Sequence, residues 1–347
     1  MQRYEDRSTK NQSHATLFIL LGFSSHGDLY IFLFLAFFLV YTFTLLGNLL
    51  IIVLSRMDSH LNTPMYFFLS NFSFLEICYT TVTVPKMLSD LFTGNRTISF
   101  CGCLTQMYFF FFFGTTEFFL LALMAFDRYL AICNPLRYQM IMSYKVCLLL
   151  VLCSWISGSL VPITPTSVIS QLSFNSSNKV NHFFCDVAPI IKLSSDNTFV
   201  INLIVFMLSS IVVLSSILLV MVSYIFIICT ILKIPSATGK QKAFSTCASH
   251  LIVVTIFYGT VIFMYVRPAS SDSIDLNKVV SIFYSVITPM LNPIIYSLRN
   301  KEVKEALRKA TRKLRTFENH SSVITSISSY KADLTTNKNG NEFRRSK

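Results

Sequence analysis

Charged side chains are scarce in this sequence of 347 residues, where Asp, Glu, Lys and Arg make up 13% and hydrophobic residues 53%. With a mean hydropathy of +0.57, the chain is too apolar for a water-soluble globule of this length. We therefore expect it to lie in a lipid bilayer. A helix of ~20 apolar residues crosses the ~30 Å hydrocarbon layer because it satisfies its own backbone polar groups.

Seven apolar stretches reach that length and predict an all-α membrane protein, a seven-transmembrane helix bundle. No repeat or soluble domain interrupts them. The predicted spans are 29–54, 64–84, 103–133, 146–169, 199–232, 243–266 and 279–298. The predicted organisation is an extracellular N-terminus (1–28), the bundle (29–298), an amphipathic cytoplasmic helix (299–315) and a disordered cytoplasmic tail (316–347).

A cleavable signal peptide is also missing from residues 1–28, so the first span is expected to act as the insertion signal. If the spans alternate, the basic residues near their ends gather on one side, which should be cytoplasmic. These residues include Arg56, Arg137, Lys145 and the run 299–315. A plasma-membrane protein with its N-terminus outside follows. The net charge of +12 is concentrated beside the membrane, which favours anionic lipid over nucleic acid as its partner.

Residues 301–315 place Val303, Ala306, Leu307, Ala310 and Leu314 on one stripe surrounded by cations. This pattern is typical of a short amphipathic eighth helix at the membrane surface. A solvated helix is the alternative.

The exterior side carries few groups open to covalent modification. Three glycosylation sequons fall there, at Asn11, Asn95 and Asn175. The cysteine count of 9 is odd, so at least one thiol stays unpaired. Only Cys101, Cys103 and Cys185 face the oxidising exterior, which predicts a bridge from the third span to the loop before the fifth.

Four polar residues lie near mid-depth in four different spans: Asn48, Glu76, Glu117 and Asn292. Ionisable groups at that depth cost from ~3 kcal/mol upward and so are candidates for function. If they meet, the two carboxyl groups must share a proton, bind a cation such as Na⁺, or stay neutral. Polar contacts that hold helices together are the alternative.

At the cytoplasmic end of the third span, Asp127, Arg128 and Tyr129 form a triplet that resembles the ionic motif of rhodopsin-like G-protein-coupled receptors. Further motifs in family order, over about residues 17–300, resemble those of odorant receptors. They are Leu21-Gly-Phe23, Gly47-Asn48, Pro64 to Ser70 (PMYFFLS), Ser223-Tyr224, Lys242 to Cys247 (KAFSTC), Phe257-Tyr-Gly259 and Pro289 to Tyr296 (PMLNPIIY).

The resemblance implies a receptor for small, mostly apolar volatile ligands that activates a stimulatory G protein of the olfactory type and raises cyclic AMP. Arrestin and trafficking chaperones are further implied partners, and no enzymatic activity or cofactor is expected. Arg128 should be held by Asp127 at rest and released on activation. The implied switch residues are Asp127, Arg128, Tyr129, Tyr224, Asn292, Pro293 and Tyr296.

The family position of the ligand site implies the outer halves of the third, fifth, sixth and seventh spans. The implied contacts are Met107, Phe110, Phe111, Gly114, Thr115, Leu208, Ser209, Tyr258, Val261, Ile262, Tyr265 and Ser285. Most are apolar, so burial of an apolar ligand would drive binding. Packing is the alternative role for each.

At several positions the residue differs from that of related receptors, and these differences narrow the class of receptor. Phe110 stands where amine receptors have Asp, and Val286 stands where opsins have the retinal Lys. The second extracellular cysteine pair common in odorant receptors is replaced by Asn175 and Ser195, so the resemblance implies a bridge between Cys103 and Cys185 and a free Cys101.

The sequence also bears on three other functions. A rhodopsin-like receptor for a non-odorant small molecule or lipid metabolite shares every feature above and must be separated by ligand tests. A polytopic transporter or channel should show internal repeats or a charged pore ring, which we do not find. A membrane enzyme would need a nucleophile and base or metal ligands, yet His60, His182 and His250 lie in separate segments.

Overall fold

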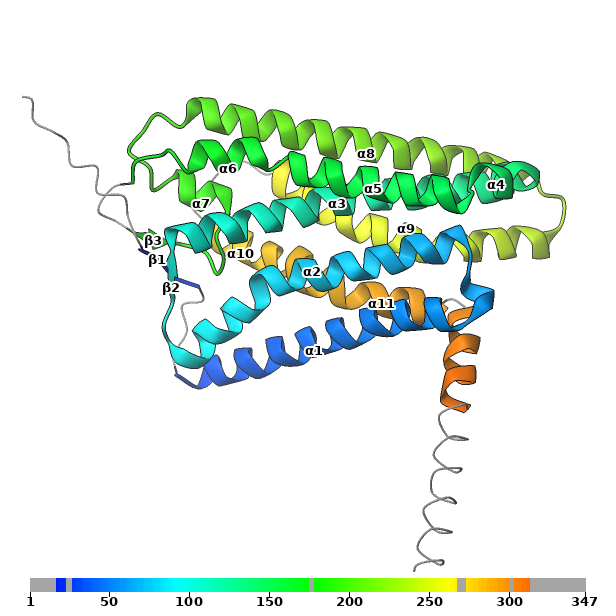
Figure 1. The fold of residues 1–347 in the computed structure, drawn as a ribbon, viewed down its shortest axis with the longest axis horizontal. Helices are drawn as coiled ribbons and strands as arrows, with labels where there is room; N and C mark the ends of the chain where they lie inside the picture. The colour runs from blue at the N-terminus through cyan, green and yellow to red at the C-terminus, as the bar shows by residue number, and fades with distance from the viewer. Residues whose placement is uncertain (1–16, 23–26, 175–177, 267–272, 300–301, 313–347) are drawn as a thin grey trace, which may run out of the picture.

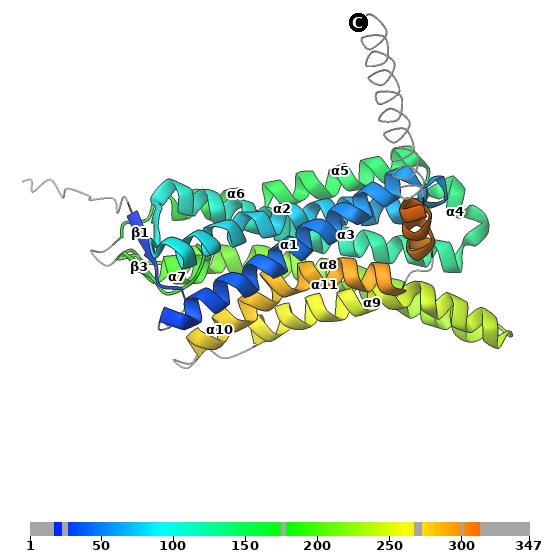
Figure 2. The same cartoon turned by 90° about the horizontal axis from the view of Figure 1, so that it is seen from below.

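The computed structural model describes residues 17–22, 27–174, 178–266, 273–299 and 302–312. Long helices run roughly side by side along the molecule, and short strands lie at one end (Figures 1 and 2). The helices are α1 (Gly27–Met57), η1 (Ser59–Leu61), α2 (Pro64–Thr93), α3 (Phe100–Cys133), α4 (Pro135–Ile141), α5 (Tyr144–Leu160), α6 (Ile163–Ile169), α7 (Val187–Ile191), α8 (Phe199–Lys233), α9 (Ala237–Val266), α10 (Ser273–Ile282), η2 (Phe283–Ile287) and α11 (Thr288–Arg299). The strands are β1 (Leu17–Leu20), β2 (Thr97–Ser99) and β3 (Lys179–Val180).

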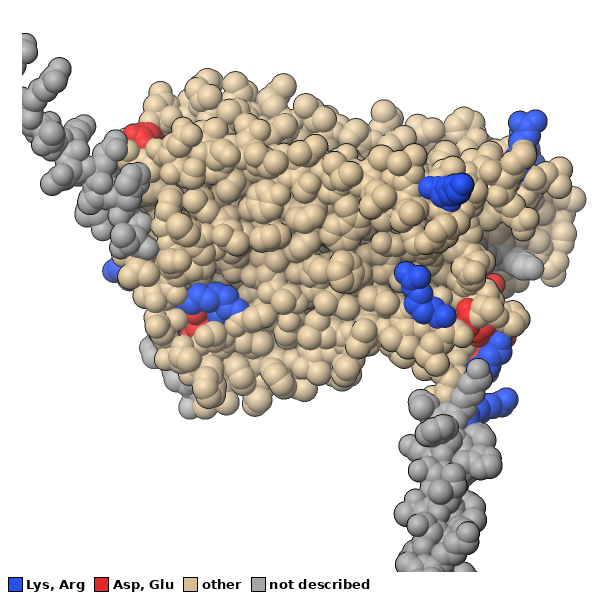
Figure 3. Space-filling model, viewed as in Figure 1, with Lys and Arg blue, Asp and Glu red and all other residues tan. Residues whose placement is uncertain are grey.

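Six helical segments are long and apolar enough to cross a membrane, and the bent helix α9 makes up to seven. On the face shown in Figure 3, charged side chains gather at the two ends of the molecule and leave a broad uncharged belt between them. Large hydrophobic side chains are exposed along the outer helices, such as Phe32 at 67% and Leu218 at 63%. An apolar surface of this kind suits lipid, and the predicted membrane bundle is confirmed.

Local sequence explains where several spans begin and end. Helix α2 begins at Pro64, whose missing N–H costs nothing in a first helical turn, and stops at Gly94 in the left-handed conformation. The predicted fourth span, 146–169, is present as a membrane-length segment from Tyr144 to Ile169, but a break around Pro162 divides it into α5 and α6. Proline lacks the N–H that would continue the helix and restricts the residue before it.

The seventh span contains a short π-helix, η2, between α10 and α11. The wider turn lets Thr288 donate its hydroxyl to the Phe283 carbonyl, five residues earlier, at 2.9 Å. This local change of helical period was not predicted. It adjoins Pro289 of α11, so the change of period lies next to a proline within the seventh span.

A small sheet closes the end of the bundle that carries α7 and α10 (Figure 1). Strand β1 is its centre, antiparallel to β2 and parallel to β3. The Phe18 side chain is fully buried and packs edge-on against Phe174, with ring centroids 5.3 Å apart. Residues 17–22 were predicted only as part of an extracellular N-terminus, so this sheet is a finding of the structure.

At the opposite end of the bundle, residues 302–312 form a helix that turns away from the bundle axis (Figure 1). Val303 and Ala306 are buried against the bundle core, with 3% and 2% of their surfaces exposed. Tyr66 donates to Glu302 at 2.6 Å, and Lys309 lies 3.4 Å from Asp58. The predicted amphipathic helix is therefore present, although part of its apolar stripe packs on protein; Leu314 and the tail 316–347 lie outside the described residues.

Candidate functional site

The ionic triplet lies at the C-terminal end of α3, among α4, α8 and α9. We call this end of the bundle the inner end and the end with the small sheet the outer end. Asp127 is buried and accepts a hydrogen bond from the Tyr138 hydroxyl of α4 at 2.8 Å. Arg128 is also buried, and its Nε has no hydrogen-bond partner. Within the described residues no ion pair shorter than 4 Å joins the two; Tyr138 supplies the hydrogen bond to Asp127, and the charge of Arg128 acts on the carboxylate without a close contact. Arg128 is thus a buried cation with an Nε–H that donates no hydrogen bond.

A buried hydrogen-bonded chain crosses the bundle beside Arg128. The Tyr224 hydroxyl of α8 lies 2.7 Å from Nδ1 of His250 in α9, and Nε2 of His250 lies 3.2 Å from the Leu121 carbonyl of α3. Because a carbonyl only accepts, the tautomer that satisfies both contacts has its proton on Nε2, and Tyr224 donates to Nδ1. This chain joins three helices and keeps the Tyr224 hydroxyl occupied. His250 was not predicted as a site residue.

Tyr296 of α11 completes the inner site. Its side chain is buried, its ring contacts Phe72 of α2 at 6.4 Å, and its hydroxyl has no hydrogen-bond partner. Arg128 lies close enough to Tyr224, His250 and Tyr296 for its charge to act on all three. The structure thus brings most of the predicted switch residues to one end of the bundle, around one guanidinium.

The four mid-depth polar residues are all buried. The Asn292 amide donates to the Glu76 carboxyl, and Asn48 donates to the Pro289 carbonyl of the seventh span at 3.3 Å. Glu117 of α3 lies close enough to Glu76 for their charges to interact. Three oxygens here accept no hydrogen bond: Oδ1 of Asn48, Oε2 of Glu76 and Oδ1 of Asn292. Such buried unpaired acceptors require an explanation.

Close backbone contact accompanies this cluster. A Cβ added at Gly47 would lie 3.0 Å from Cγ of Pro293, so glycine lets α1 approach the proline of α11. Asn48, the next residue, then reaches the Pro289 carbonyl that helix α11 cannot satisfy in the usual way. Gly47-Asn48 of α1 and the motif around Pro293 of α11 therefore contact each other directly.

The predicted ligand contacts divide by burial. Tyr258 has ring contacts with Phe118 and Phe257. Phe110 has ring contacts with Tyr79, Phe184 and Tyr284. Buried are Met107, Phe110, Thr115, Tyr258 and Ser285; partly buried are Phe111, Gly114, Leu208, Ser209 and Val261. Ile262 is 43% exposed, and the side chain of Tyr265 lies outside the described residues.

A loop fixed by a disulfide covers the outer end of α3. The bond joins Cys103 and Cys185, as predicted, and Cys101 is free and exposed. Gln106 holds the same loop by accepting from the Cys185 backbone N–H at 3.0 Å and donating to the Val82 carbonyl of α2. Phe184 in this loop packs on Phe110, with ring centroids 4.6 Å apart.

Burial shifts the pKa values of two titratable groups in this loop, His182 and Asp186. Burial and the nearby Lys278 lower the pKa of His182 to about 3, so its ring is neutral and Nδ1 can accept from the Phe184 N–H at 3.4 Å. Burial raises the pKa of Asp186 to about 6, although its bond from the Val187 N–H opposes the shift. Both groups help to shape the segment that lies over Phe110.

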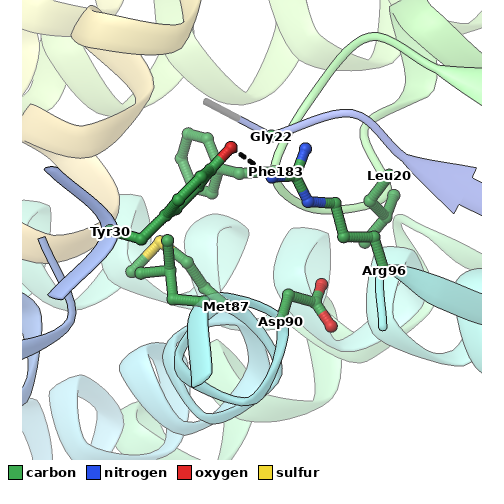
Figure 4. A pocket seen from close by; sticks show the side chains of 8 residues that line it. Leu20, Gly22, Tyr30, Met87, Asp90, Arg96 and Phe183 are labelled. Atoms are coloured by element: carbon green, nitrogen blue, oxygen red, sulfur yellow. Dashed lines mark hydrogen bonds between the residues drawn. The ribbon is translucent and has the colours of Figure 1, made fainter. Parts of the chain in front are cut away.

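A small cleft opens beside this loop, between β1 and the outer ends of α1 and α2 (Figure 4). Its volume of about 20 Å³ suffices for one or two water molecules. Its lining consists of Leu20, Gly22, Tyr30, Met87, Asp90, Leu91, Arg96 and Phe183. None of these was a predicted ligand contact. The Arg96 guanidinium reaches across the cleft to the Tyr30 hydroxyl and lies over its ring, 5.2 Å from the centroid.

Of the site residues that were not predicted, the sequence could have indicated His250 but not the partners of Arg96 and Lys278. His250 lies three residues after a recognised motif that ends at Cys247, and its depth in an apolar span could have singled it out. Arg96 and Lys278 lie near span ends, where basic residues are common, and their partners are backbone carbonyls of distant segments. No pattern in the sequence could have identified those partners.

The chain resembles known proteins over most of its length. A family model described as olfactory receptor matches residues 37–313. Human olfactory receptor 2AP1 is 47% identical over 88% of this chain and 99% of the relative. Human olfactory receptor 5A2 is 52% identical over 87% and 93%, and mouse olfactory receptor 5AP2 is 51% identical over 86% and 95%.

Among solved structures, squid rhodopsin superposes with a TM-score of 0.65 at 18% identity, covering 84% of this chain and 88% of that one. This likeness concerns the fold, a seven-helix membrane bundle. The extent of the family match and the level of identity to several relatives go further than the fold. The chain, a multi-pass membrane receptor and not an enzyme, belongs to the olfactory receptor family.

Proposed function

We propose that this receptor binds small, mostly apolar volatile molecules in the outer half of the bundle and activates a stimulatory G protein of the olfactory type. Helix α3 carries the observation on which the proposal rests. At one end it presents Phe110 beneath the disulfide-held loop, and at the other it holds the buried Arg128 with an unpaired Nε. One rigid element thus connects a buried apolar site to a buried cation.

The proposed activation step frees Arg128 for the G protein. Breaking the bond between Tyr224 and His250 separates α8 from α9, opens the inner end of the bundle and frees the Tyr224 hydroxyl for the guanidinium. The ligand drives this step only through a higher affinity for the open state than for the closed one. The test is a cyclic AMP assay in cells against a panel of volatiles. A response to lipid metabolites alone would favour the alternative receptor class.

We expect Tyr258→Ala to shift the potency of any volatile that activates the receptor. Tyr258 is buried beside Phe118, and removing a buried aromatic ring from a ligand contact costs about 1–3 kcal/mol, or roughly 5- to 150-fold in the half-maximal concentration. Dose–response curves of cyclic AMP at matched surface expression measure the shift. Phe206→Ala is the control, because Phe206 is 59% exposed on α8. Equal potency of the Tyr258 variant and the parent would remove Tyr258 from the ligand site.

We further propose an extracellular N-terminus and a cytoplasmic C-terminus in the plasma membrane. The basic residues of the helix 302–312 and its pairing with Asp58 support this orientation. Asn95, which is exposed after α2, is then the described sequon open to glycosylation; Asn11 and Asn175 lie outside the described residues. Arrestin and trafficking chaperones remain partners proposed from the family.

For the mid-depth cluster we propose that Glu76 and Glu117 hold Na⁺. A shared proton would satisfy one acceptor, whereas three oxygens of Asn48, Glu76 and Asn292 are unpaired, and hard cations prefer a set of oxygen ligands. The purified receptor should therefore melt at a higher temperature in sodium chloride than in choline chloride, and Glu117→Gln should lose that difference. A melting temperature that is the same in both salts would favour the proton.

A further inference from the structure

Residues 17–22, which we call the N-terminal strap, lie across the outer end of the bundle. Strand β1 forms the first part of the strap, with Phe18 fully buried and Leu20 only 1% exposed. The backbone of the strap is paired on both sides: the Leu20 N–H donates to the Arg96 carbonyl and the Leu21 N–H to the Val180 carbonyl, each at 2.9 Å. The strap is therefore an integral part of the closed end.

Two cations hold the carbonyls at the end of the strap. Arg96, which follows α2, donates to the Leu21 carbonyl at 2.6 Å and to the Tyr30 hydroxyl of α1. Lys278 of α10 donates to the Gly22 carbonyl at 3.1 Å. The strap thus joins the outer ends of three separate spans through hydrogen bonds from charged donors, which are stronger than neutral ones.

The strap bears directly on the loop that covers Phe110. The Gly22 N–H donates to the His182 carbonyl at 3.1 Å, and two residues later Phe184 lies on Phe110. On its other side the loop is fixed by the disulfide of Cys185. Because the disulfide cannot open, the strap side is the side on which the loop can lift.

We propose that the N-terminal strap is a lid, closed by Arg96 and Lys278, that controls access from the exterior to the buried site beneath Phe184. Arg96 and Lys278 are positioning residues that act through the strap and the loop. The identity of the buried site as a ligand site rests on the proposed function above. The cleft of Figure 4, which lies between the strap and α2, marks the edge where the lid separates from the bundle.

The test measures access without any ligand. Ser285, which is fully buried next to Val286 of the hydrophobic cluster that contains Phe110, is replaced by cysteine in a Cys101→Ser background that removes the exposed thiol at the start of α3. A charged methanethiosulfonate reagent is then applied outside intact cells. We expect Arg96→Gln to raise the labelling rate about 10-fold, the effect of losing one hydrogen bond from a charged donor. Lys278→Gln should raise it as well.

Matched variants keep the test decisive. Lys192→Gln removes an exposed cation of the same outer face and should leave the rate unchanged. If Arg96→Gln does not reach the cell surface, Tyr30→Phe replaces it, because this change removes one acceptor of the guanidinium and keeps the charge. Labelling at the parental rate in Lys278→Gln and in the surviving Arg96 or Tyr30 variant would overturn the lid. Faster labelling in a receptor that no volatile activates would keep the lid and reject the proposed ligand.

Discussion

Arg128→Ala is expected to abolish agonist-stimulated cyclic AMP while the receptor still reaches the cell surface. The guanidinium is buried at the inner end of α3 with an unpaired Nε, and its charge acts on Tyr224, His250 and Tyr296. If the open state exposes this one cation to the G protein, its loss removes a contact made only in that state. The agonist then has no open complex to favour. The measurement is cyclic AMP at saturating agonist, together with surface staining.

Arg137→Ala is the matched control, because Arg137 is exposed on α4, nine residues further along the chain. It should signal as the parent does. Tyr138→Phe adds a graded test, since it removes the hydroxyl that Asp127 accepts at 2.8 Å and leaves the carboxylate free to pair with Arg128. That variant should need more agonist for the same response. Undiminished signalling by Arg128→Ala would remove the proposed mechanism.

The spans could be predicted because one physical requirement dominates them. A bilayer demands about 20 apolar residues per helix, so α8 (Phe199–Lys233) was predicted to within a residue and α3 (Phe100–Cys133) at its inner end. Breaks within spans were harder, because they depend on local hydrogen bonding. Pro162 divides the fourth span, whereas Pro85 lies inside a continuous α2, and hydropathy treats the two alike.

For the site residues, the depth of a side chain in the membrane could be predicted from the sequence, but its hydrogen-bond partner could not. Depth follows from counting along a span, and the four residues predicted to lie near mid-depth, Asn48, Glu76, Glu117 and Asn292, are all buried. Partners depend on how helices rotate against each other, which a single sequence does not reveal. Asp127 was therefore expected to pair with its neighbour Arg128, whereas it accepts from Tyr138, eleven residues away. The contacts of Arg96 and Lys278 with the strap are hidden for the same reason.

Cys103→Ser and Cys185→Ser are each expected to prevent delivery to the cell surface. Both residues are buried, and their bond closes a separation of 82 residues. The chain-entropy account of such a closure gives about 4.5 kcal/mol, which is close to the lower end of the 5–15 kcal/mol that typically stabilises a folded domain. The loop also holds Phe184 on Phe110, and its strand β3 pairs with β1 of the strap. Release of the loop therefore disrupts both contacts at the outer end. Flow cytometry with an N-terminal epitope measures delivery.

Cys101→Ser is the control that isolates the bond from the loss of a thiol. Cys101 lies two residues before Cys103 on the same helix, but it is exposed and free, so its replacement should leave delivery unchanged. The double variant Cys103→Ser/Cys185→Ser should be no worse than either single one, because each single change already breaks the same bond. Normal delivery of either single variant would show that Gln106, which holds Cys185 and α2 through two hydrogen bonds, suffices to fix the loop on its own.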